Sequence, residues 1–468
     1  MSVPRPPIAT EPVEPGLAAA PRAPELALEG EPPPRGALPE SLPPPSTAAG
    51  KLVRALTSWR TASVSLLSFS SGLPLGLVYI AIPDWLFKSG VDIKTVGLIT
   101  LVQFPWMLKV VWSPLLDRYT PPWLGRRRGW AAVAQVALMI LGFALAGVGD
   151  RPDAPWIIGA LAMAIAFASA TQDIAIDAYA VDVLRADEQG IAVGAKTAIY
   201  RGAMYVSGGL AITAAGAWSW PVVNVGLALL FVPMLVITVL APEPRVVPPP
   251  ARSLQEAVWA PLAEIVRRPR ALEILAFVVC YKLADNLAGA LLRPFLAHLG
   301  YSDFDRGVTL ATVALAATLI GTFLGAALTT VIGLGHALWI FGFLQALSNI
   351  GYLVLADSPP DRGLLVGAMG FENLTQGMGT GAFSVLLFRL TQKRFSATQY
   401  ALFTCLFSLP RLASGPISGI LVDRMGWTNF LWMTIAACIP GLLLLQRFVP
   451  LGAREPTLEA RPAETPAS

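Results

Sequence analysis

The feature that most constrains this chain is a series of apolar stretches, each about 20 residues long, separated by short charged segments. At 1.5 Å per residue, a helix of this length spans a hydrocarbon core of roughly 30 Å. Most of the stretches lack the polar stripe of a helix at the surface of a soluble domain. Charged residues make up only 14% of the sequence, against about 25% in soluble domains. We therefore expect an all-α membrane protein.

The apolar stretches predict twelve transmembrane spans, six in each half of the chain. They are residues 62–83, 95–115, 129–148, 155–182, 190–214 and 219–240, followed by 273–297, 307–332, 336–356, 363–388, 398–421 and 428–448. This layout predicts an N-terminal six-helix bundle over 51–241, a cytoplasmic linker over 242–271 and a C-terminal six-helix bundle over 272–450. The linker is rich in Pro and Arg, and its mildly amphipathic segment 253–268 is expected at the membrane surface.

Both ends of the chain are polar. Residues 1–50 contain 14 prolines and no periodic apolar pattern, so they predict a disordered or polyproline II tail. Residues 451–468 predict a second disordered cytoplasmic tail. No short apolar segment follows Met1, so we do not expect a signal peptide.

Lys and Arg are distributed unevenly between the two sets of loops. If both termini are cytoplasmic, the inner loops and tails next to the spans carry seventeen of these residues and the outer loops carry six. Cytoplasmic loops normally hold the excess of positive charge. The sequence therefore predicts that the N- and C-termini are both cytoplasmic, which agrees with the even number of spans.

Eleven charged side chains fall inside the predicted spans. Each costs about 2.5–3.5 kcal/mol at the bilayer centre, or roughly 30 kcal/mol together, which exceeds a typical folding free energy several times. They must therefore face partners or a water-filled cavity. They are Lys109, Asp173, Asp177, Asp182, Lys196, Arg201, Lys282, Asp285, Arg293, Glu372 and Arg411.

The spacing of these charges suggests particular pairs. Asp173 and Asp177 are four residues apart and share one face of their helix. Lys109 is expected at the depth of Asp173, so these two side chains could pair. Lys282 and Asp285, three residues apart, are predicted neighbours about halfway through the bilayer. An alternative interpretation is that such pairs are structural and only lock helices together.

Arg201 and Arg411 fall near the midplane, one in each half of the chain. Opposed basic residues from two bundles can clamp an anionic substrate. The same arrangement would suit several anionic solutes, and the balance of six basic to five acidic charges inside the spans favours none of them.

The sequence offers little for catalysis or metal binding. The three cysteines are an odd number without CxxC spacing, and the two histidines, His298 and His336, lie near predicted helix ends. We therefore expect no catalytic residues, no metal site, no cofactor and no nucleic-acid partner. A membrane-embedded enzyme stays a remote alternative because it would need a positioned nucleophile and base.

Glycine-rich stretches occur in several spans, including Gly202–Gly209, Gly321–Gly325 and Gly377–Gly381. Small residues at this spacing usually allow membrane helices to pack closely. No Lys-Ser or Lys-Thr pair follows them, so they do not predict nucleotide-binding loops.

Between the second and third spans, Asp117-Arg118 is followed by Gly125-Arg126-Arg127-Arg128. This segment resembles the cytoplasmic loop motif of the major facilitator superfamily. The segment departs from the usual pattern by Ser113 in place of Gly and by extra residues between Arg118 and Gly125. This variant resembles the AmpG-type muropeptide permeases and their relatives, the acetyl-coenzyme A transporters.

Further matches cover residues 60–450. The Gln172-Asp173-Ile block is similar to a signature that both groups share, and Tyr200-Arg201 and Tyr281-Lys282 follow in order. The blocks that begin at Glu372-Asn373 and at Lys393 resemble the AmpG branch more closely.

The resemblance implies a major-facilitator-type fold and a monomeric carrier in the bacterial inner membrane that imports 1,6-anhydro-muropeptides together with protons. It implies proton coupling by Asp173, Asp177, Asp285 and Glu372, and substrate binding by Gln172, Arg201, Lys282, Asn373, Gln376 and Arg411. The gating loop motif would comprise Lys109, Asp117, Arg118, Arg126, Arg127 and Arg128. Acetyl-coenzyme A or another anionic solute stays open as the substrate, because both groups share the Gln172-Asp173 signature.

Overall fold

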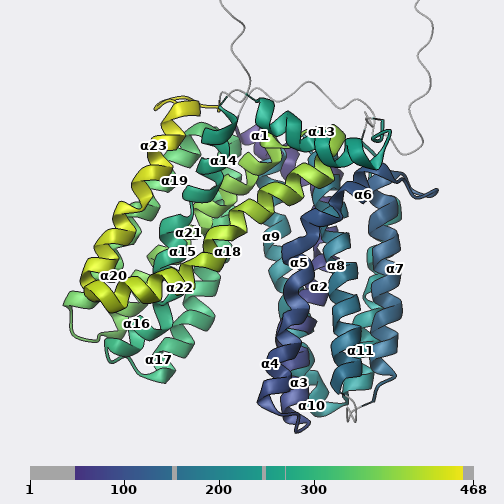
Figure 1. Cartoon of the computed structure of the whole chain (residues 1–468), viewed down its shortest axis with the longest axis horizontal. Helices are drawn as coiled ribbons and strands as arrows, with labels where there is room; N and C mark the ends of the chain where they lie inside the picture. Colours follow the sequence, from purple (N-terminus) through teal and green to yellow (C-terminus); the bar gives the residue numbers. More distant parts are fainter. Residues whose placement is uncertain (1–47, 150–154, 245–248, 269, 457–468) are drawn as a thin grey trace, which may run out of the picture.

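The computed structural model describes residues 48–149, 155–244, 249–268 and 270–456 (Figure 1). Within these ranges the chain forms helices and no strand. The helices form two bundles, one from each half of the sequence, as predicted. The predicted tails over 1–50 and 451–468 lie largely outside the described residues.

The N-terminal bundle contains six spans, several of them made of consecutive short helices. The first is α2 (Trp59–Gly76), η1 (Leu77–Ala81) and α3 (Ile82–Lys88), and the second is α4 (Ile93–Ile99), η2 (Thr100–Gln103), α5 (Phe104–Leu108), η3 (Lys109–Val111) and α6 (Ser113–Arg118). The others are α7 (Arg126–Ala146), α8 (Pro155–Val183), α9 (Gln189–Tyr205) with η4 (Val206–Leu210) and α10 (Ala211–Ala217), and α11 (Trp220–Leu229) with α12 (Phe231–Leu240). A helix that the sequence did not predict, α1 (Ala48–Thr57), precedes them.

The C-terminal bundle follows the linker helix α13 (Leu254–Arg267), which coincides with the predicted amphipathic segment. Its spans are α14 (Ala271–Cys280), α15 (Leu283–Ala290) and α16 (Leu292–His298); α17 (Asp303–Val308), η5 (Thr309–Ala314) and α18 (Leu315–Ile332); α19 (Leu334–Ser348) and α20 (Ile350–Asp357); and α21 (Arg362–Leu390). After η6 (Lys393–Phe395) come α22 (Ser396–Ala436) and α23 (Cys438–Phe448).

Seven helical stretches among the described residues are long and apolar enough to cross a membrane, or eight if a pair bent by 41° is counted as one span. That pair is α14–α15 with α16, which is the predicted seventh span. The predicted second span coincides with a series of short helices and the fifth is interrupted by η4, whereas the tenth is the unbroken 29-residue helix α21. The predicted eleventh and twelfth spans fall together in one of the seven stretches, Lys393–Phe448. The predicted eleventh span continues beyond residue 421, because α22 loses its helical backbone only at Gly426, where φ is 77°.

Proline residues account for some of the breaks in these spans. Pro105 and Pro114 each lie in the first turn of a new short helix, where the missing backbone N–H costs no helical hydrogen bond. As a result the second span changes direction in steps, and Lys109 lies at one of the breaks. Three π-helical turns, η1, η4 and η5, interrupt other spans. Such turns are frequent at functional sites.

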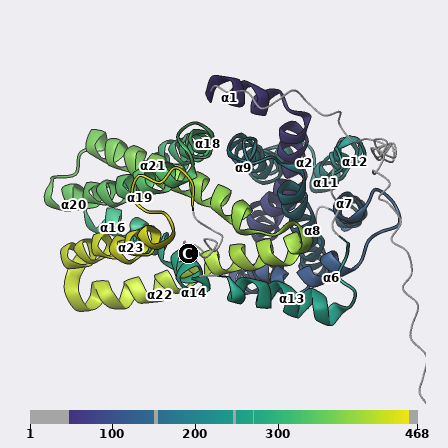
Figure 2. The ribbon, with the colours of Figure 1, turned by 90° about the horizontal axis from the view of Figure 1, so that it is seen from above.

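The two bundles meet at one end of the molecule and diverge toward the other (Figure 1). We call these the α13 end and the α17 end, after the helices that lie there. The largest buried apolar cluster contains residues of both halves, among them Ile174, Ala192, Ala326 and Phe403. Two further clusters belong to a single bundle each. Seen from above, α22 crosses toward the N-terminal bundle and α13 runs along the same side (Figure 2).

Glycines allow α18 and α21 to pack closely, as the sequence predicted. A Cβ atom on Gly321 would lie 2.1 Å from the carbonyl oxygen of Leu374, and one on Gly325 would lie 2.2 Å from that of Met378. Backbone this close leaves no room for a side chain. The two helices thus form a rigid pair, and their polar residues face the cavity described below.

Candidate functional site

A cavity of ≈ 730 Å³ lies between the bundles, lined mainly by the C-terminal one. Its volume is in the range of small-molecule binding sites. The polar lining residues are Thr197, Arg201, Lys282, Asp285, Asn286, Arg293, Thr318, Thr322, Asn373, Gln376, Thr380, Ser408 and Arg411. The structure thus brings together five of the six predicted substrate-binding residues. The exception is Gln172.

The charge of this lining is strongly asymmetric. Among the described residues, four basic side chains line it, Arg201, Lys282, Arg293 and Arg411, against one acidic residue, Asp285. The other acidic residues inside the spans do not line it, so the near balance counted along the sequence does not hold at the cavity wall. A cavity of this charge favours an anionic ligand.

Lys282 and Asp285 form the predicted pair, with Nζ 2.9 Å from Oδ2. Lys282 lies at the break between α14 and α15, and its ammonium also donates to the carbonyl oxygen of Gln376, at 3.0 Å. Both side chains of the pair are nearly buried, at 4% and 6% exposure. The two charged groups are therefore held at the cavity wall mainly by each other.

A second charged cluster lies in the N-terminal bundle. Asp177 accepts hydrogen bonds from both Lys109 and Lys196, on three different spans. The predicted pairing of Lys109 with Asp173 is corrected here: the ammonium of Lys109 lies 3.5 Å from Asp177, one turn further along α8. The step in the backbone at η3 displaces Lys109 from the depth that a straight helix would give it. Lys109 therefore belongs to this cluster and not to the loop motif.

Asp173 is buried next to this cluster, and its Oδ1 has no hydrogen-bond partner among the described residues. Neighbouring Gln172 is fully buried and donates to Ser70, at 2.9 Å. Gln135 donates to the same serine hydroxyl, and Thr238 donates to Gln135. Gln172 thus lies inside the N-terminal bundle, away from the cavity lining.

Glu372 lies on α21 within the C-terminal bundle and is 5% exposed. It is absent from the cavity lining, one turn before Gln376, which lines it. The four predicted proton-coupling residues therefore fall into two groups, Asp173 and Asp177 in one bundle, and Asp285 and Glu372 in the other.

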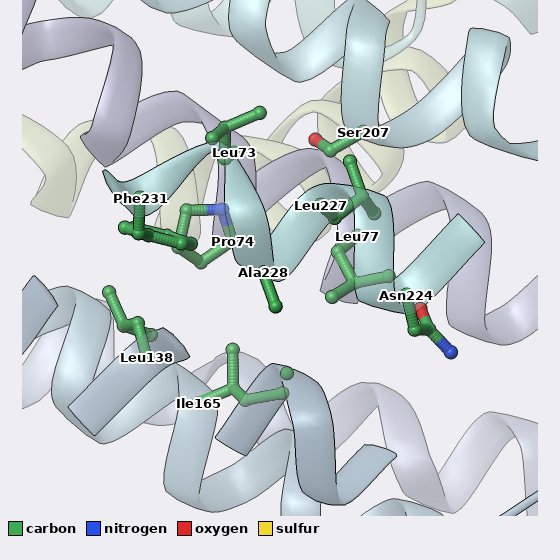
Figure 3. Close-up of a pocket in the computed structure, with 11 residues that line it drawn as sticks. Leu73, Pro74, Leu77, Leu138, Ile165, Ser207, Asn224, Leu227, Ala228 and Phe231 are labelled. Carbon is green, nitrogen blue, oxygen red and sulfur yellow. The ribbon is translucent and has the colours of Figure 1, made fainter. Parts of the chain in front are cut away.

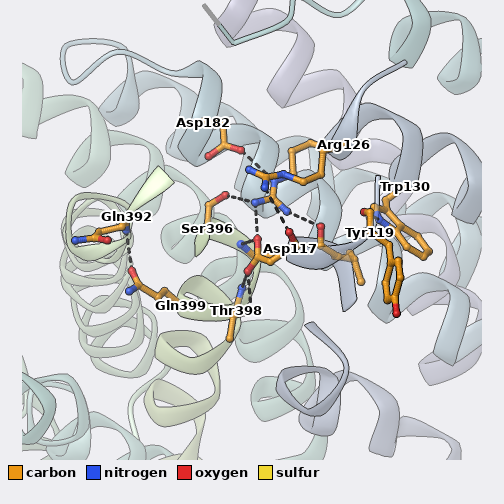
Figure 4. A network of polar contacts seen from close by, with 12 residues as sticks. Asp117, Tyr119, Arg126, Trp130, Asp182, Gln392, Ser396, Thr398 and Gln399 are labelled. Atoms are coloured by element: carbon orange, nitrogen blue, oxygen red, sulfur yellow. Dashed lines mark hydrogen bonds and ion pairs between the residues drawn. The ribbon is translucent and has the colours of Figure 1, made fainter. Parts of the chain in front are cut away.

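A network of polar contacts joins the two bundles at the α13 end (Figure 4). Arg127 donates to Asp117 at 2.6 Å, to Asp182 at 3.0 Å and to Ser396 at 2.8 Å. The first two residues belong to the N-terminal bundle and Ser396 begins α22 of the other. With Arg126 included, this group has two acidic residues, Asp117 and Asp182, and two basic ones. Its charges therefore balance, as buried ionic groups require.

Asp117 acts across the bundle interface as a cap for α22. Its carboxylate accepts from the backbone N–H of Thr398 at 2.8 Å and from its hydroxyl at 2.6 Å. The first N–H groups of a helix lack internal partners and carry partial positive charge, so a carboxylate there is favourable. Asp117 is completely buried.

The remaining basic residues of the loop contact other parts of the structure. Arg126 donates to the carbonyl oxygen of Asp117, and Arg128 pairs with Glu243 after α12. Arg118 lies over the ring of Tyr119 and is not part of the cross-bundle contacts described above. The predicted loop motif is therefore divided: Asp117 and Arg127 contact the other bundle, while Arg128 ties α7 to the end of α12.

Two further contacts join the bundles at the α13 end. Gly190 and Gly194 of α9 lie against α18, and a Cβ atom on Gly190 would be 2.3 Å from the carbonyl oxygen of Ala326. Arg389 reaches from the end of α21 to Gln189. The linker is also held at this end, since Glu264 of α13 accepts hydrogen bonds from Gln392 and Gln399 of the C-terminal half.

A small cavity inside the N-terminal bundle is unrelated to these contacts (Figure 3). Its volume is ≈ 20 Å³, and Leu77, Ile165, Phe231 and Asn224 are among its lining residues. That is room for about one water molecule. Both polar side-chain atoms of Asn224 lack a partner among the described residues, so a single water is the occupant that fits.

Sequence reasoning missed the partners on α22. Ser396 precedes the predicted eleventh span and Thr398 is its first residue, and small hydroxyl residues there are typical of a helix N-terminus. That signal marks the start of the helix, but it does not identify a carboxylate from the other bundle as its cap. Among the described residues no group of His, Cys, Asp or Glu could hold a metal ion.

The family model of the major facilitator superfamily matches residues 64–414. This chain belongs to that superfamily. It is 41% identical to the anhydromuropeptide permease of Escherichia coli (strain K12) over 388 residues, 82% of this chain and 79% of the relative. A putative transporter, AmpG 4, of Rickettsia conorii is 28% identical over 406 residues, 84% of this chain and 98% of the relative.

Solved structures agree on the fold. A bacterial homologue of the iron transporter ferroportin, in an outward-facing state, superposes with a TM-score of 0.60 at 13% identity, over 83% of this chain and 98% of the other. The human organic anion transporter MFSD10 superposes with a TM-score of 0.58 at 12% identity, over 83% of this chain and 99% of the other. The chain is thus a multi-pass membrane transporter of the major-facilitator fold, homologous to the AmpG permeases, as the sequence predicted.

Proposed function

We propose that this protein imports 1,6-anhydro-muropeptides across the bacterial inner membrane as a monomer, driven by protons that move inward with the substrate. The observation that carries the proposal is the 41% identity to the anhydromuropeptide permease over most of both chains. The cavity supports it, because a muropeptide presents sugar hydroxyls and carboxylates. Asn373 and Gln376 suit the hydroxyls, and Arg201, Lys282 and Arg411 suit the carboxylates.

The excess of Lys and Arg in the corresponding loops supports a cytoplasmic α13 end, with both termini on that side. In that orientation the cavity is closed toward the cytoplasm by Asp117, Arg127 and α22, and extends toward the outside. The structure then corresponds to the substrate-accepting state of an importer. Opening inward requires the Asp117–Thr398 contact to break.

Proton coupling requires a carboxyl group that changes protonation as its surroundings alternate. Asp173 fits this role because one of its carboxylate oxygens is buried with no partner in the described part of the chain, while two lysines hold neighbouring Asp177. Protonation of Asp173 would remove a buried charge and leave the Asp177 pairs intact. Asp285 and Glu372 are the corresponding candidates in the other bundle. Gln172 has the role of positioning α8 and not of binding substrate.

The test is uptake of radiolabelled anhydro-muropeptide into proteoliposomes, with and without an inward proton gradient. The proposal expects accumulation above the external concentration only with the gradient, and collapse when a protonophore is added. Labelled acetyl-coenzyme A serves as the competing anion, since the basic cavity lining suits it too. Uptake of acetyl-coenzyme A alone would overturn the muropeptide assignment.

A further inference from the structure

We propose that a recess at the α17 end of the cavity, lined by Arg293 and Arg306, is a subsite for the carboxylates of the substrate's stem peptide. This inference rests on the proposed function, because it assigns one part of a muropeptide to one part of the cavity. Neither arginine belongs to the set that the sequence assigned to substrate binding.

The recess adjoins the main cavity. Its volume is ≈ 360 Å³, and Arg293 and Leu310 line both spaces. Asp303 and Arg306 of α17 form its outer part. A ligand in the main cavity that extends past Arg293 and Leu310 would enter the recess.

The charges of the recess call for an anion. The side chain of Arg293 is exposed and makes no hydrogen bond or ion pair with the described residues. Arg306 pairs with Asp303 and donates to the carbonyl oxygen of Arg293, but its buried Nε has no acceptor among the described residues. The recess thus contains two guanidinium groups and one carboxylate, which pairs with Arg306. A carboxylate ligand would supply the missing acceptors, which a planar guanidinium fork binds well.

The distribution of polar groups along the cavity gives the ligand a direction. Asn373 and Gln376, near the middle of α21, and Thr318, in the first turn of α18, contribute amide and hydroxyl groups to the lining. Arg293 lies eleven residues beyond Lys282, roughly 16 Å along the helices at 1.5 Å per residue. An extended peptide covers about 3.3–3.6 Å per residue. A disaccharide against the amides therefore leaves its peptide directed toward Arg293.

The test compares two labelled substrates in proteoliposomes, the anhydro-disaccharide alone and the same disaccharide carrying an acidic tripeptide. The variants are Arg293→Gln, Arg306→Gln and the charge-preserving Arg293→Lys. Arg424→Gln is the matched control, because Arg424 is an exposed arginine near the α17 end that lines neither space. All four are reconstituted as full-length chains.

We expect Arg293→Gln and Arg306→Gln to raise KM for the peptide-bearing substrate about tenfold, and to change KM for the bare disaccharide less than twofold. Arg293→Lys should recover part of the loss, and the control should match wild type. Retained disaccharide uptake shows that a variant is folded. An equal effect on both substrates, or no effect on either, would overturn the subsite while leaving the proposed function in place. If wild type carries neither substrate, the proposed function fails and this inference fails with it.

Discussion

The carboxylate of Asp117 in one bundle caps the first turn of α22 in the other, accepting both the backbone N–H and the hydroxyl of Thr398. A single side chain thereby links α6, the last helix of the second span, to α22, the helix of the eleventh. Because Asp117 also binds Arg127, which reaches Ser396, the closed α13 end depends on one compact group of buried contacts.

Replacing Asp117 with Asn should weaken this closure and favour the inward-open state. The substitution removes the charge that binds Arg127 and the α22 terminus, and breaking a buried ion pair typically costs about 3–5 kcal/mol. Spin labels at Ser89 and Phe304, both exposed at the α17 end, would report a shorter distance than in wild type, on a background with the native cysteines replaced. Asp423→Asn, an exposed change at the same end, is the control. An unchanged distance distribution would show that Asp117 does not hold the gate.

The contact between α9 and α18 makes a second prediction. Gly194→Ala places a Cβ atom 2.8 Å from the ring of Phe323 and 2.9 Å from its Cα, so the bundles must separate at the α13 end. We expect the distance between the spin labels at Ser89 and Phe304 to shorten as in the Asp117 variant, and uptake to fall several-fold. Gly202→Ala on the same helix is the matched control, because its Cβ would meet nothing within 4 Å. Equal behaviour of the two variants would argue against close packing at this contact.

Asp173 should be required for coupling and not for binding. Asp173→Asn, alone or with Asp177→Asn, is expected to abolish gradient-driven accumulation, because a neutral amide cannot exchange a proton. Exchange of labelled for unlabelled substrate at equal pH should persist in the single variant. Asp357→Asn, an exposed change at the end of α20, is the control. Retained accumulation in a normally inserted double variant would remove α8 from the coupling mechanism.

The sequence was sufficient to predict the helical class, the two bundles, the pair of Lys282 with Asp285 and the close packing at Gly321. These depend on hydropathy and on helical spacing, which are local properties. The partner of Lys109 could not be predicted, because the proline-associated steps in the second span change its depth. The burial of Gln172 depends on Ser70 of another span, and the cap on α22 depends on the other bundle. Each miss concerns a contact between distant segments, for which the chain carries no local signal.

Lys282 and Asp285 allow a structural role to be separated from a role in transport. Both side chains are almost buried, so removing one leaves the other as an unpaired charge, at a cost of about 3–5 kcal/mol. We expect Lys282→Met and Asp285→Asn each to lower the thermal unfolding midpoint of the purified protein. The double variant carries no unpaired charge, so it should recover much of that loss. If the pair also acts in binding and coupling, the double variant should remain inactive in uptake although it is stable. Wild-type uptake by the double variant would mean that the pair only joins α15 to its own bundle.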